Sequence, residues 1–278
     1  MKAVPRLTVR TMGLFFNSRY RLARWTRKSK FFNRIVTKWF FDEDEMVVLP
    51  KDSVAKTRKV EMNLDIEEAG ERTVLPSDVV KSVIRRLQDK IFIMDFCLCR
   101  KSNKCEDYPV DRGCIFLGNG TDRIPPEMGH HATIEETEAY LDECASKGLV
   151  HIVGRNKLDR IWLSTGSKNR LVTICNCCPC CCLWNVTRDI SDEIGSSFKR
   201  MDGVDVVTDS DRCLGCGLCR DICFTRAITI EDGKSSINQK LCRGCGRCAD
   251  ICPAEAITLT YDETKVESES ARIAALFE

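Results

Sequence analysis

The residues of this sequence that are best suited to chemistry are its 19 cysteines. They form three groups and one isolated residue, Cys144. Four lie between residues 97 and 114, six lie within residues 175–182, and eight lie within residues 213–252. Thiols at this density suit three kinds of chemistry, namely disulfide bonding, binding of soft metals and thiol redox reactions.

The setting of the cysteines favours metal binding. Disulfide-dense domains are usually small and exported, whereas this chain has 278 residues and no basic–apolar–small signal pattern. The sequence therefore predicts a cytoplasmic protein whose thiolates bind metal. No apolar run approaches 18 residues, so we expect no membrane-spanning helix.

The last eight cysteines form an internal repeat. Residues 212–229 read RCLGCGLCRDICFTRAIT, and residues 241–258 read LCRGCGRCADICPAEAIT. Each unit has the spacing C-x2-C-x2-C-x3-C. Three thiolates two residues apart can surround one iron–sulfur cube, whereas the fourth lies on the following helical turn and points to the other cube.

Residues 205–261 resemble bacterial-type dicluster ferredoxins, and the repeat carries this resemblance. It implies a pseudo-twofold α+β domain with two [4Fe–4S] clusters. Pro253 follows the fourth cysteine as in that family, whereas Phe224 takes the place of proline in the first unit. A pair of zinc sites is the alternative for these thiolates. By position, the resemblance implies that Cys213, Cys216, Cys219 and Cys252 hold one cluster, and that Cys242, Cys245, Cys248 and Cys223 hold the other.

Residues 171–184 contain the densest group of cysteines and read LVTICNCCPCCCLW. Pro179 prevents a continuous helix or strand here, and neighbouring cysteines can form few disulfides of acceptable geometry. We therefore expect a soft-metal site. One four-coordinate metal cannot use all six thiols, so some serve a second metal or pack as small buried hydrophobes. The six are Cys175, Cys177, Cys178, Cys180, Cys181 and Cys182.

The remaining group has the irregular spacing C-x-C-x5-C-x8-C and follows a predicted strand at residues 91–96. The six-cysteine run also follows a predicted strand. Two such strand-to-loop corners, placed side by side, would assemble one site. Our preferred hypothesis is a third [4Fe–4S] cluster bound by both segments, with zinc as the alternative. The first segment supplies Cys97, Cys99, Cys105 and Cys114.

A looser resemblance extends over most of the chain. The combination of CLCR, YP, GCIFLG, VHIVGRN and ICNCCPCCC is similar to uncharacterised, cysteine-rich, ferredoxin-fused proteins of anaerobic bacteria and archaea. This resemblance implies an anaerobic redox setting. It implies no particular reaction.

The first 41 residues differ in charge from the rest of the chain. They contain 11 Lys or Arg, no acidic residue, and nine of the 20 aromatic residues. Apolar residues near helical spacing predict a basic amphipathic helix. Such a helix could dock on an acidic partner, on the protein's own body, or on an anionic membrane surface. Nucleic acid is disfavoured, because no recognition motif accompanies the charge.

The elements that must position the cysteines follow from hydrophobic periodicity and capping signals. We expect strands at residues 46–50, 60–66, 149–154, 159–164 and 170–174, and a helix that Ser77 caps. Thr133 and Glu136 form a capping box for a further helix that ends before Gly148.

The predicted fold class is α+β, with a mixed α/β N-terminal domain that carries cysteine-rich loops and a C-terminal ferredoxin-like dicluster domain. The expected divisions are a basic amphipathic segment at 1–41, the mixed α/β cysteine-rich domain at 42–200, the dicluster ferredoxin domain at 201–261 and an acidic tail at 262–278.

These patterns predict an electron-transfer iron–sulfur protein that passes single electrons to a redox protein partner. The sequence has three histidines and lacks a P-loop, a nucleophile elbow and HExxH, so no catalytic residue is assigned. An electron carrier or an oxidoreductase subunit is favoured over a stand-alone enzyme. The alternative is an oxidoreductase whose catalytic metal site is built from residues 97–114 and 175–182 and is fed by the ferredoxin domain. Residues 1–41 would allow peripheral contact with the inner face of the membrane.

Overall fold

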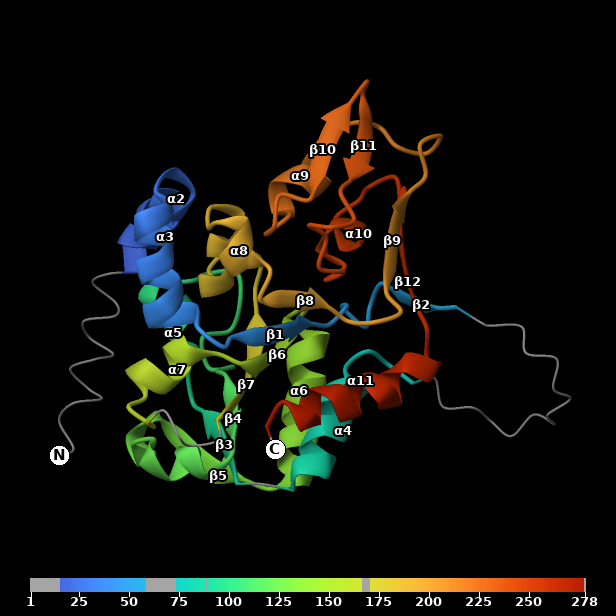
Figure 1. Ribbon diagram of the computed structural model, residues 1–278. Helices are drawn as coiled ribbons and strands as arrows, with labels where there is room; N and C mark the ends of the chain where they lie inside the picture. The colour runs from blue at the N-terminus through green and yellow to red at the C-terminus, as the bar shows by residue number, and fades with distance from the viewer. Residues whose placement is uncertain (1–15, 59–73, 89, 167–170, 278) are drawn as a thin grey trace, which may run out of the picture.

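A seven-stranded sheet forms the centre of the molecule (Figure 1). The computed structural model describes residues 16–58, 74–88, 90–166 and 171–277. The strands have the order β5-β3-β4-β7-β6-β1-β8, and neighbours are antiparallel except for the parallel pair β1 and β8. Their bounds are β1 Glu45–Val48, β3 Ile91–Met94, β4 Ile115–Leu117, β5 Gly129–Ala132, β6 Val150–Arg155, β7 Val172–Cys177 and β8 Phe198–Arg200.

Strand β7 separates the core beneath the helices from the buried cysteines of the six-cysteine run. Its side chains alternate between the two faces of the sheet, as the two-residue period of a strand requires. Val172 and Ile174 enter a core shared with three helices, whereas Cys175 and Cys177 enter a second core on the opposite face. The three helices are α4 Asp78–Leu87, α6 Ile134–Ser146 and α11 Thr264–Ala275.

Short helices and turns cover the cysteine face of the sheet. They are α5 Leu98–Ser102, η3 Asn119–Arg123, η4 Pro126–Met128, α7 Lys157–Trp162, η5 Leu183–Arg188 and α8 Asp192–Gly195. The strand predicted at residues 159–164 is wrong, because residues 159–162 lie in α7 and residues 163–164 form a turn. The Asn156 side chain accepts a hydrogen bond from the Asp159 backbone at 2.8 Å and thereby caps the helix.

Other predictions for this region have mixed outcomes. The Thr133 cap is confirmed, since its hydroxyl accepts a hydrogen bond from the Glu136 backbone N–H. The Ser77 cap is wrong, because its side chain makes no capping hydrogen bond. Asp78 accepts instead from the Leu75 backbone at 2.8 Å. The predicted strand at 60–66 lies outside the described residues, and β7 begins at Val172 and extends into the cysteine run.

A second, smaller region contains the cysteine repeat and lies against the upper side of the sheet in Figure 1. A hairpin joins β10 to β11, and a three-stranded sheet has the order β2-β12-β9. Strand β2 comes from the preceding part of the chain and pairs in parallel with β12. The bounds are β2 Ala55–Thr57, β9 Asp205–Thr208, α9 Leu218–Ile222, β10 Ile228–Glu231, β11 Lys234–Ile237, α10 Arg247–Asp250 and β12 Ile257–Tyr261. Together the regions give a mixed α and β organisation with several sheets, consistent with the predicted α+β class.

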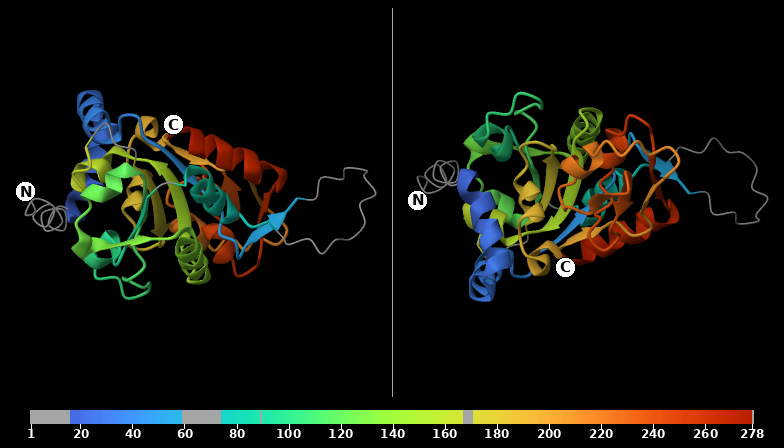
Figure 2. Two further views of the ribbon diagram at one scale, coloured as in Figure 1. Left: turned by 90° about the horizontal axis from the view of Figure 1, so that it is seen from below. Right: turned by 90° about the horizontal axis from the view of Figure 1, so that it is seen from above.

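The C-terminal residues correct the prediction of an acidic tail. Helix α11 lies beside α4, as Figure 1 and the left view of Figure 2 show. Its Val266 and Ile273 side chains are buried in the core that α4 also enters. The acidic residues had obscured an apolar stripe of helical spacing on the other side of the same segment.

The basic N-terminal segment is divided rather than continuous. Helices α2 Arg19–Lys28 and α3 Lys30–Val36 meet at Ser29, whose hydroxyl caps α3 by accepting from the Phe32 backbone. A short π-helical turn, η2 Thr37–Phe41, leads to β1. The segment also contains η1 Phe16–Ser18. Within the described part of the chain, each helix is too short or too polar to cross a membrane.

Replacement of Ile273 by alanine tests the packing of α11. The change leaves a cavity in a fully buried position, so we expect the free energy of unfolding to fall by about 2 to 5 kcal/mol. Denaturant titration of the anaerobically purified protein measures it. Ile161→Ala, at a position 45% exposed, serves as the control and should change it by less than about 0.5 kcal/mol. Equal effects of the two substitutions would contradict the packing of α11.

Candidate metal centres

The cysteine repeat lines two separate cavities. Each cavity takes three cysteines from one unit and the fourth from the other, because the last cysteine of each run follows a helical turn and lies beside the first three cysteines of the other unit. The first cavity is lined by Cys213, Cys216, Cys219 and Cys252. The second cavity is lined by Cys223, Cys242, Cys245 and Cys248.

Backbone N–H groups point at the sulfurs of both cavities. The Ala227 N–H donates to Cys223 Sγ, and the Ala256 N–H donates to Cys252 Sγ, each at 3.3 Å. These two bonds occupy equivalent positions of the repeat. Hydrogen bonds of this kind favour the thiolate that a metal requires. Four thiolates with N–H donors around one cavity suit an iron–sulfur cluster.

The two cavities differ in their exposure to solvent. Around the first cavity Cys216 is exposed, and the neighbouring Leu214 and Leu218 are 71% and 43% exposed. Hydrogen bonds from the Gly215 and Ser235 backbone hold the pKa of Cys213 below its ordinary value. Around the second cavity, burial raises the pKa of Cys245 to about 11. The first cavity therefore faces solvent and the second faces the protein interior.

Arg247 connects the second cavity to the six-cysteine run. It stands at the position of Leu218 in the repeat, yet it is buried. Its guanidinium donates to the carbonyl oxygens of Cys177 and Cys178, each at 3.1 Å, and lies over the Phe224 ring. Phe224, the residue that replaces proline, packs in the same core as Cys178 and Trp184.

The segments 97–114 and 175–182 converge on one buried chamber of about 40 Å³. Cys114 Sγ lies 3.9 Å from Cys175 Sγ. The Leu183 backbone N–H and the Trp184 indole N–H donate to Cys99 Sγ and Cys175 Sγ respectively, each at 3.4 Å. The cysteines that line the chamber are Cys97, Cys99, Cys114, Cys175, Cys177, Cys178 and Cys182.

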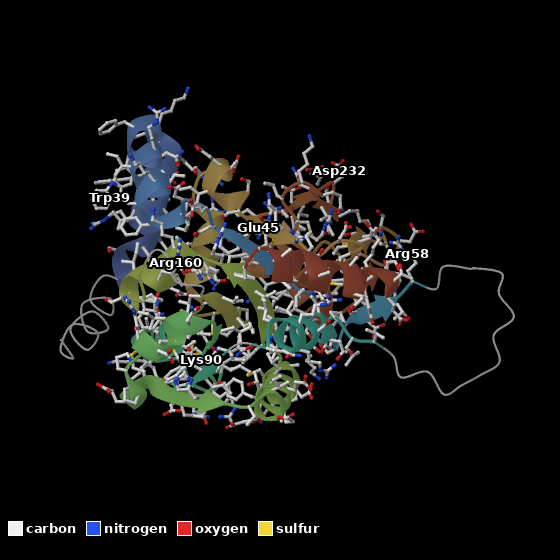
Figure 3. The ribbon with its side chains drawn as sticks, turned by 60° about the horizontal axis from the view of Figure 1, so that its bottom comes forward. Trp39, Glu45, Arg58, Lys90, Arg160 and Asp232 are labelled. Carbon is white, nitrogen blue, oxygen red and sulfur yellow. The ribbon has the colours of Figure 1, made fainter. Side chains whose placement is uncertain are left out.

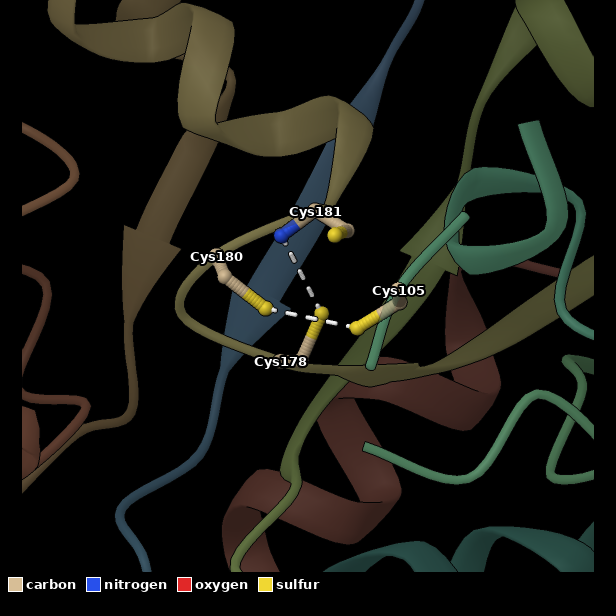
Figure 4. Close-up of side chains that lie close together, drawn as sticks. All are labelled: Cys105, Cys178, Cys180 and Cys181. Atoms are coloured by element: carbon tan, nitrogen blue, oxygen red, sulfur yellow. Dashed lines mark hydrogen bonds between the residues drawn. The ribbon is translucent and has the colours of Figure 1, made fainter. Parts of the chain in front are cut away.

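The remaining three cysteines of these segments, Cys105, Cys180 and Cys181, lie outside the chamber. They gather with Cys178 at the turn after β7, where all four sulfurs lie within 4.8 Å of one another (Figure 4). The structure thus brings all ten cysteines of the two segments together, but in two groups. The preferred hypothesis has one shared site, but the sequence also predicts that some of the six thiols in residues 175–182 serve a second metal or pack as small buried hydrophobes, and it leaves open which ones.

Arg100 supplies positive charge to the chamber. It is fully buried and donates to the Asn176 carbonyl at 2.9 Å and to the Arg112 carbonyl. A hydrogen bond from the Cys99 thiol and the charge of Arg100 lower the pKa of Cys97 to about 7, against the effect of burial. Although burial opposes ionisation of Cys182, hydrogen bonds from Cys177 and Cys99 hold its pKa well below the usual range. The chamber therefore favours thiolates at some positions.

The sequence did not identify either arginine as a site residue. A signal for Arg247 exists in the repeat, because its counterpart Leu218 is apolar. No comparable signal marks Arg100, whose neighbours come from distant parts of the chain.

The isolated cysteine and two of the histidines contribute no side chain to these cavities, although Cys144 packs in the same core as Cys175 and Cys177. Burial raises the pKa of Cys144, in α6, to about 12. His151 is buried with its Nδ1 2.8 Å from Asn176 Oδ1. His130 lies between the carboxylates of Asp95 and Glu136. None of these residues lines a thiol cavity described above.

Comparisons with known proteins agree with the geometry of the repeat. A family described as a 4Fe-4S binding domain matches residues 206–229, and the LdpA Fe-S cluster-binding domain matches residues 218–262. Together with the two four-thiol cavities, these matches identify residues 206–262 as a ferredoxin-like iron–sulfur domain. No curated protein and no solved structure matches the chain.

Two glycine substitutions test the loop around the first cavity. Gly215 and Gly233 have similar positive φ angles of 67° and 73°, so alanine at either position costs about 1 to 2 kcal/mol of backbone strain. A Cβ atom at Gly215 would also clash with the Gly233 carbonyl, whereas a Cβ atom at Gly233 meets nothing within 4 Å.

Gly215→Ala should therefore lower the midpoint of thermal unfolding, and the retention of iron, more than Gly233→Ala does. Calorimetry and iron analysis of anaerobically purified variants measure the two effects. Equal losses for the two variants would contradict the close approach of the two loops.

Proposed function

We propose that this protein is an electron-transfer iron–sulfur protein with two [4Fe–4S] clusters in residues 206–262. The ligand sets would be the four cysteines that line each cavity of the repeat. We further propose a third [4Fe–4S] cluster bound by cysteines of segments 97–114 and 175–182. A cluster of this kind, when bound, supplies a centre that gains or loses one electron at a time.

The observation that carries the proposal is the order of the sites from solvent to interior. The first cavity opens beside the exposed Cys216. The second cavity contributes Cys245 and Phe224 to the core that also contains Cys175 and Cys177. Arg247 links this second cavity directly to the chain at Cys177 and Cys178. Sites in this order suit the entry of electrons at the exposed first cavity and their transfer through the second cavity toward the buried chamber.

The surface around the first cavity supports a protein partner. The exposed apolar side chains of Leu214 and Leu218 line the same cavity as the exposed Cys216. Exposed apolar groups next to a reactive centre are typical of interaction sites. We propose that a redox protein docks here. We also propose an anaerobic setting, as the resemblance over most of the chain implies, and a cytoplasmic location, as the density of thiols in a chain of this size favours.

The protein's own residues would orient and tune the centres. Arg247 places positive charge beside the second cavity, and the N–H donors of Ala227 and Ala256 direct hydrogen bonds to sulfur. Charge, burial and hydrogen bonds to sulfur are the properties that set the potential of a cluster. Electron transfer requires no general acid or base, which agrees with a thiol-rich site that contains no histidine.

Replacement of Arg247 by leucine, the residue at the equivalent position of the first unit, tests the proposal. The loss of a buried positive charge destabilises the reduced, more negative state. We therefore expect the midpoint potential of the second centre to become more negative, with a smaller effect on the first. A redox titration of the anaerobically reconstituted full chain, followed by EPR, measures both potentials.

Arg220→Leu is the matched control, because Arg220 is exposed and lies close to the first unit's cysteines. Solvent screens the charge of Arg220, so Arg220→Leu should shift the midpoint potentials of the two centres less than Arg247→Leu shifts that of the second centre. The unaltered protein should contain about eight iron atoms in the repeat and about four more in the third centre. Zinc in place of iron, or no EPR signal on reduction, would refute the electron-transfer function.

The N-terminal helices support a proposal of peripheral membrane contact. One side of α2 docks on the body, since Arg27 donates to the Ile190 carbonyl at 2.7 Å and pairs with Asp192. Several aromatic side chains of residues 16–41 project away from the body of the protein. Trp39, for example, lies at the outer edge of these helices in Figure 3. Trp25, Phe31 and Trp39 are 51%, 76% and 65% exposed. Exposed aromatics among basic residues suit the interface of an anionic bilayer.

Flotation with lipid vesicles tests this contact. The full chain should bind vesicles that contain phosphatidylglycerol at low salt and should dissociate at high salt, because salt screens the basic residues. Combined Phe31→Ser and Trp39→Ser substitutions should weaken binding, whereas Ile161→Ser, at an exposed site elsewhere, should not. Absence of binding at low salt would refute the membrane proposal.

A further inference from the structure

The four thiols at the turn after β7 form a compact group of their own (Figure 4). The sulfurs of Cys105, Cys178, Cys180 and Cys181 all lie within 4.8 Å of one another. Those of Cys105 and Cys180 are 3.5 Å apart, although 75 positions separate the two residues in the chain. The fold therefore brings a distant cysteine onto a turn that already carries three.

The spacing of these sulfurs suits a single metal ion. Four thiolates at about 2.3 Å from zinc lie about 3.8 Å from one another in a regular tetrahedron. Sulfurs within 4.8 Å need only small movements to reach that arrangement. A [4Fe–4S] cluster places four irons and their sulfides between its cysteines and so requires a wider set of ligands. The chemistry of four thiolates also favours zinc among the common divalent ions.

The end of β7 separates this group from the buried chamber. Cys175 and Cys177 share one face of the strand and enter the chamber, but the strand ends at Cys177. Cys178 lies at the wall between the two groups. Its sulfur accepts a hydrogen bond from the Cys181 backbone N–H at 3.3 Å, which directs it toward the four-thiol group at the turn. The cysteines that remain for the chamber are Cys97, Cys99, Cys114, Cys175, Cys177 and Cys182.

The four-thiol group at the turn after β7, called the outer group here, is open to solvent. Hydrogen bonds around it already hold the loop of Cys105 against that turn. Cys180 is exposed and Cys178 is buried, so the group extends from solvent to the interior. The Asn103 side chain donates to the Cys99 carbonyl at 2.7 Å and to the Cys181 carbonyl at 3.3 Å. The loop that carries Cys105 is thus already fastened to the turn by hydrogen bonds.

We propose that Cys105, Cys178, Cys180 and Cys181 bind one zinc ion as a closed set of four thiolates, separate from the chamber. Four protein sulfurs leave no open coordination position, so this ion would have a structural role and would lock the loop at Cys105 onto the turn after β7. This inference rests on the proposed function in one respect. It assumes that the six cysteines that remain in the chamber would bind the proposed third cluster.

Metal analysis of cysteine variants tests this division. The full chain, produced with both iron and zinc and purified anaerobically, should contain about one zinc atom in addition to its iron. Cys105→Ala should lose the zinc and retain iron and sulfide. Cys99→Ala should lose about four iron atoms and retain the zinc. Cys144→Ala, which removes a buried thiol outside both groups, is the matched control and should retain both metals.

X-ray absorption at the zinc edge of the unaltered protein should show four sulfur neighbours at about 2.3 Å, and this measurement requires no variant. If Cys105→Ala is insoluble, Cys180→Ala replaces it, because that side chain is exposed. Absence of zinc, fewer than four sulfur neighbours, or loss of iron together with zinc on substitution of Cys105 or Cys180 would overturn the proposal. The two proposals fail in different ways. If the electron-transfer function is wrong, the reduced protein gives no EPR signal from a cluster, but the zinc content and its four sulfur neighbours are unchanged.

Discussion

The buried guanidinium of Arg247 is the interaction that joins the two cysteine-rich parts of the protein. A buried cation costs free energy unless nearby groups compensate its charge. Here the carbonyl oxygens of Cys177 and Cys178 and the ring of Phe224 surround it. Because Arg247 immediately precedes Cys248, it fixes the second cavity of the repeat against the turn that follows β7. The path that the proposed function requires depends on this contact.

The central sheet explains how so many thiols coexist with a conventional apolar core. Alternation along β7 sends Val172 and Ile174 to the helices on one face and Cys175 and Cys177 to the other. The buried thiols of the six-cysteine run therefore occupy one side of a rigid scaffold. Arg100 lies on that side, and its positive charge helps to lower the pKa of Cys97. The strand thus provides both the stability of the core and the geometry of the chamber.

Local sequence patterns predicted the parts of the structure that depend on neighbouring residues. The spacing of the repeat led to a ferredoxin-like domain, and Thr133 was identified as a helix cap. The helix at residues 157–162 was missed, because its cap at Asn156 outweighed an apolar run that resembles a strand. Arg100, and the division of ten cysteines into two groups, depend on contacts between residues far apart in the chain. Such contacts arise from the order of strands in the sheet, which spacing along the sequence does not encode.

The pairing of β2 with β12, and of α4 with α11, has a consequence for biosynthesis. Residues 55–57 and 78–87 find these partners only when residues near 260–275 have left the ribosome. Until then β2 and α4 lack these partners, although the cysteines of residues 97–182 have already been synthesised. Insertion of the proposed metal centres would then compete with oxidation of those thiols. A cell that makes this protein would benefit from a chaperone or scaffold that protects the nascent cysteines until the late strand and helix arrive.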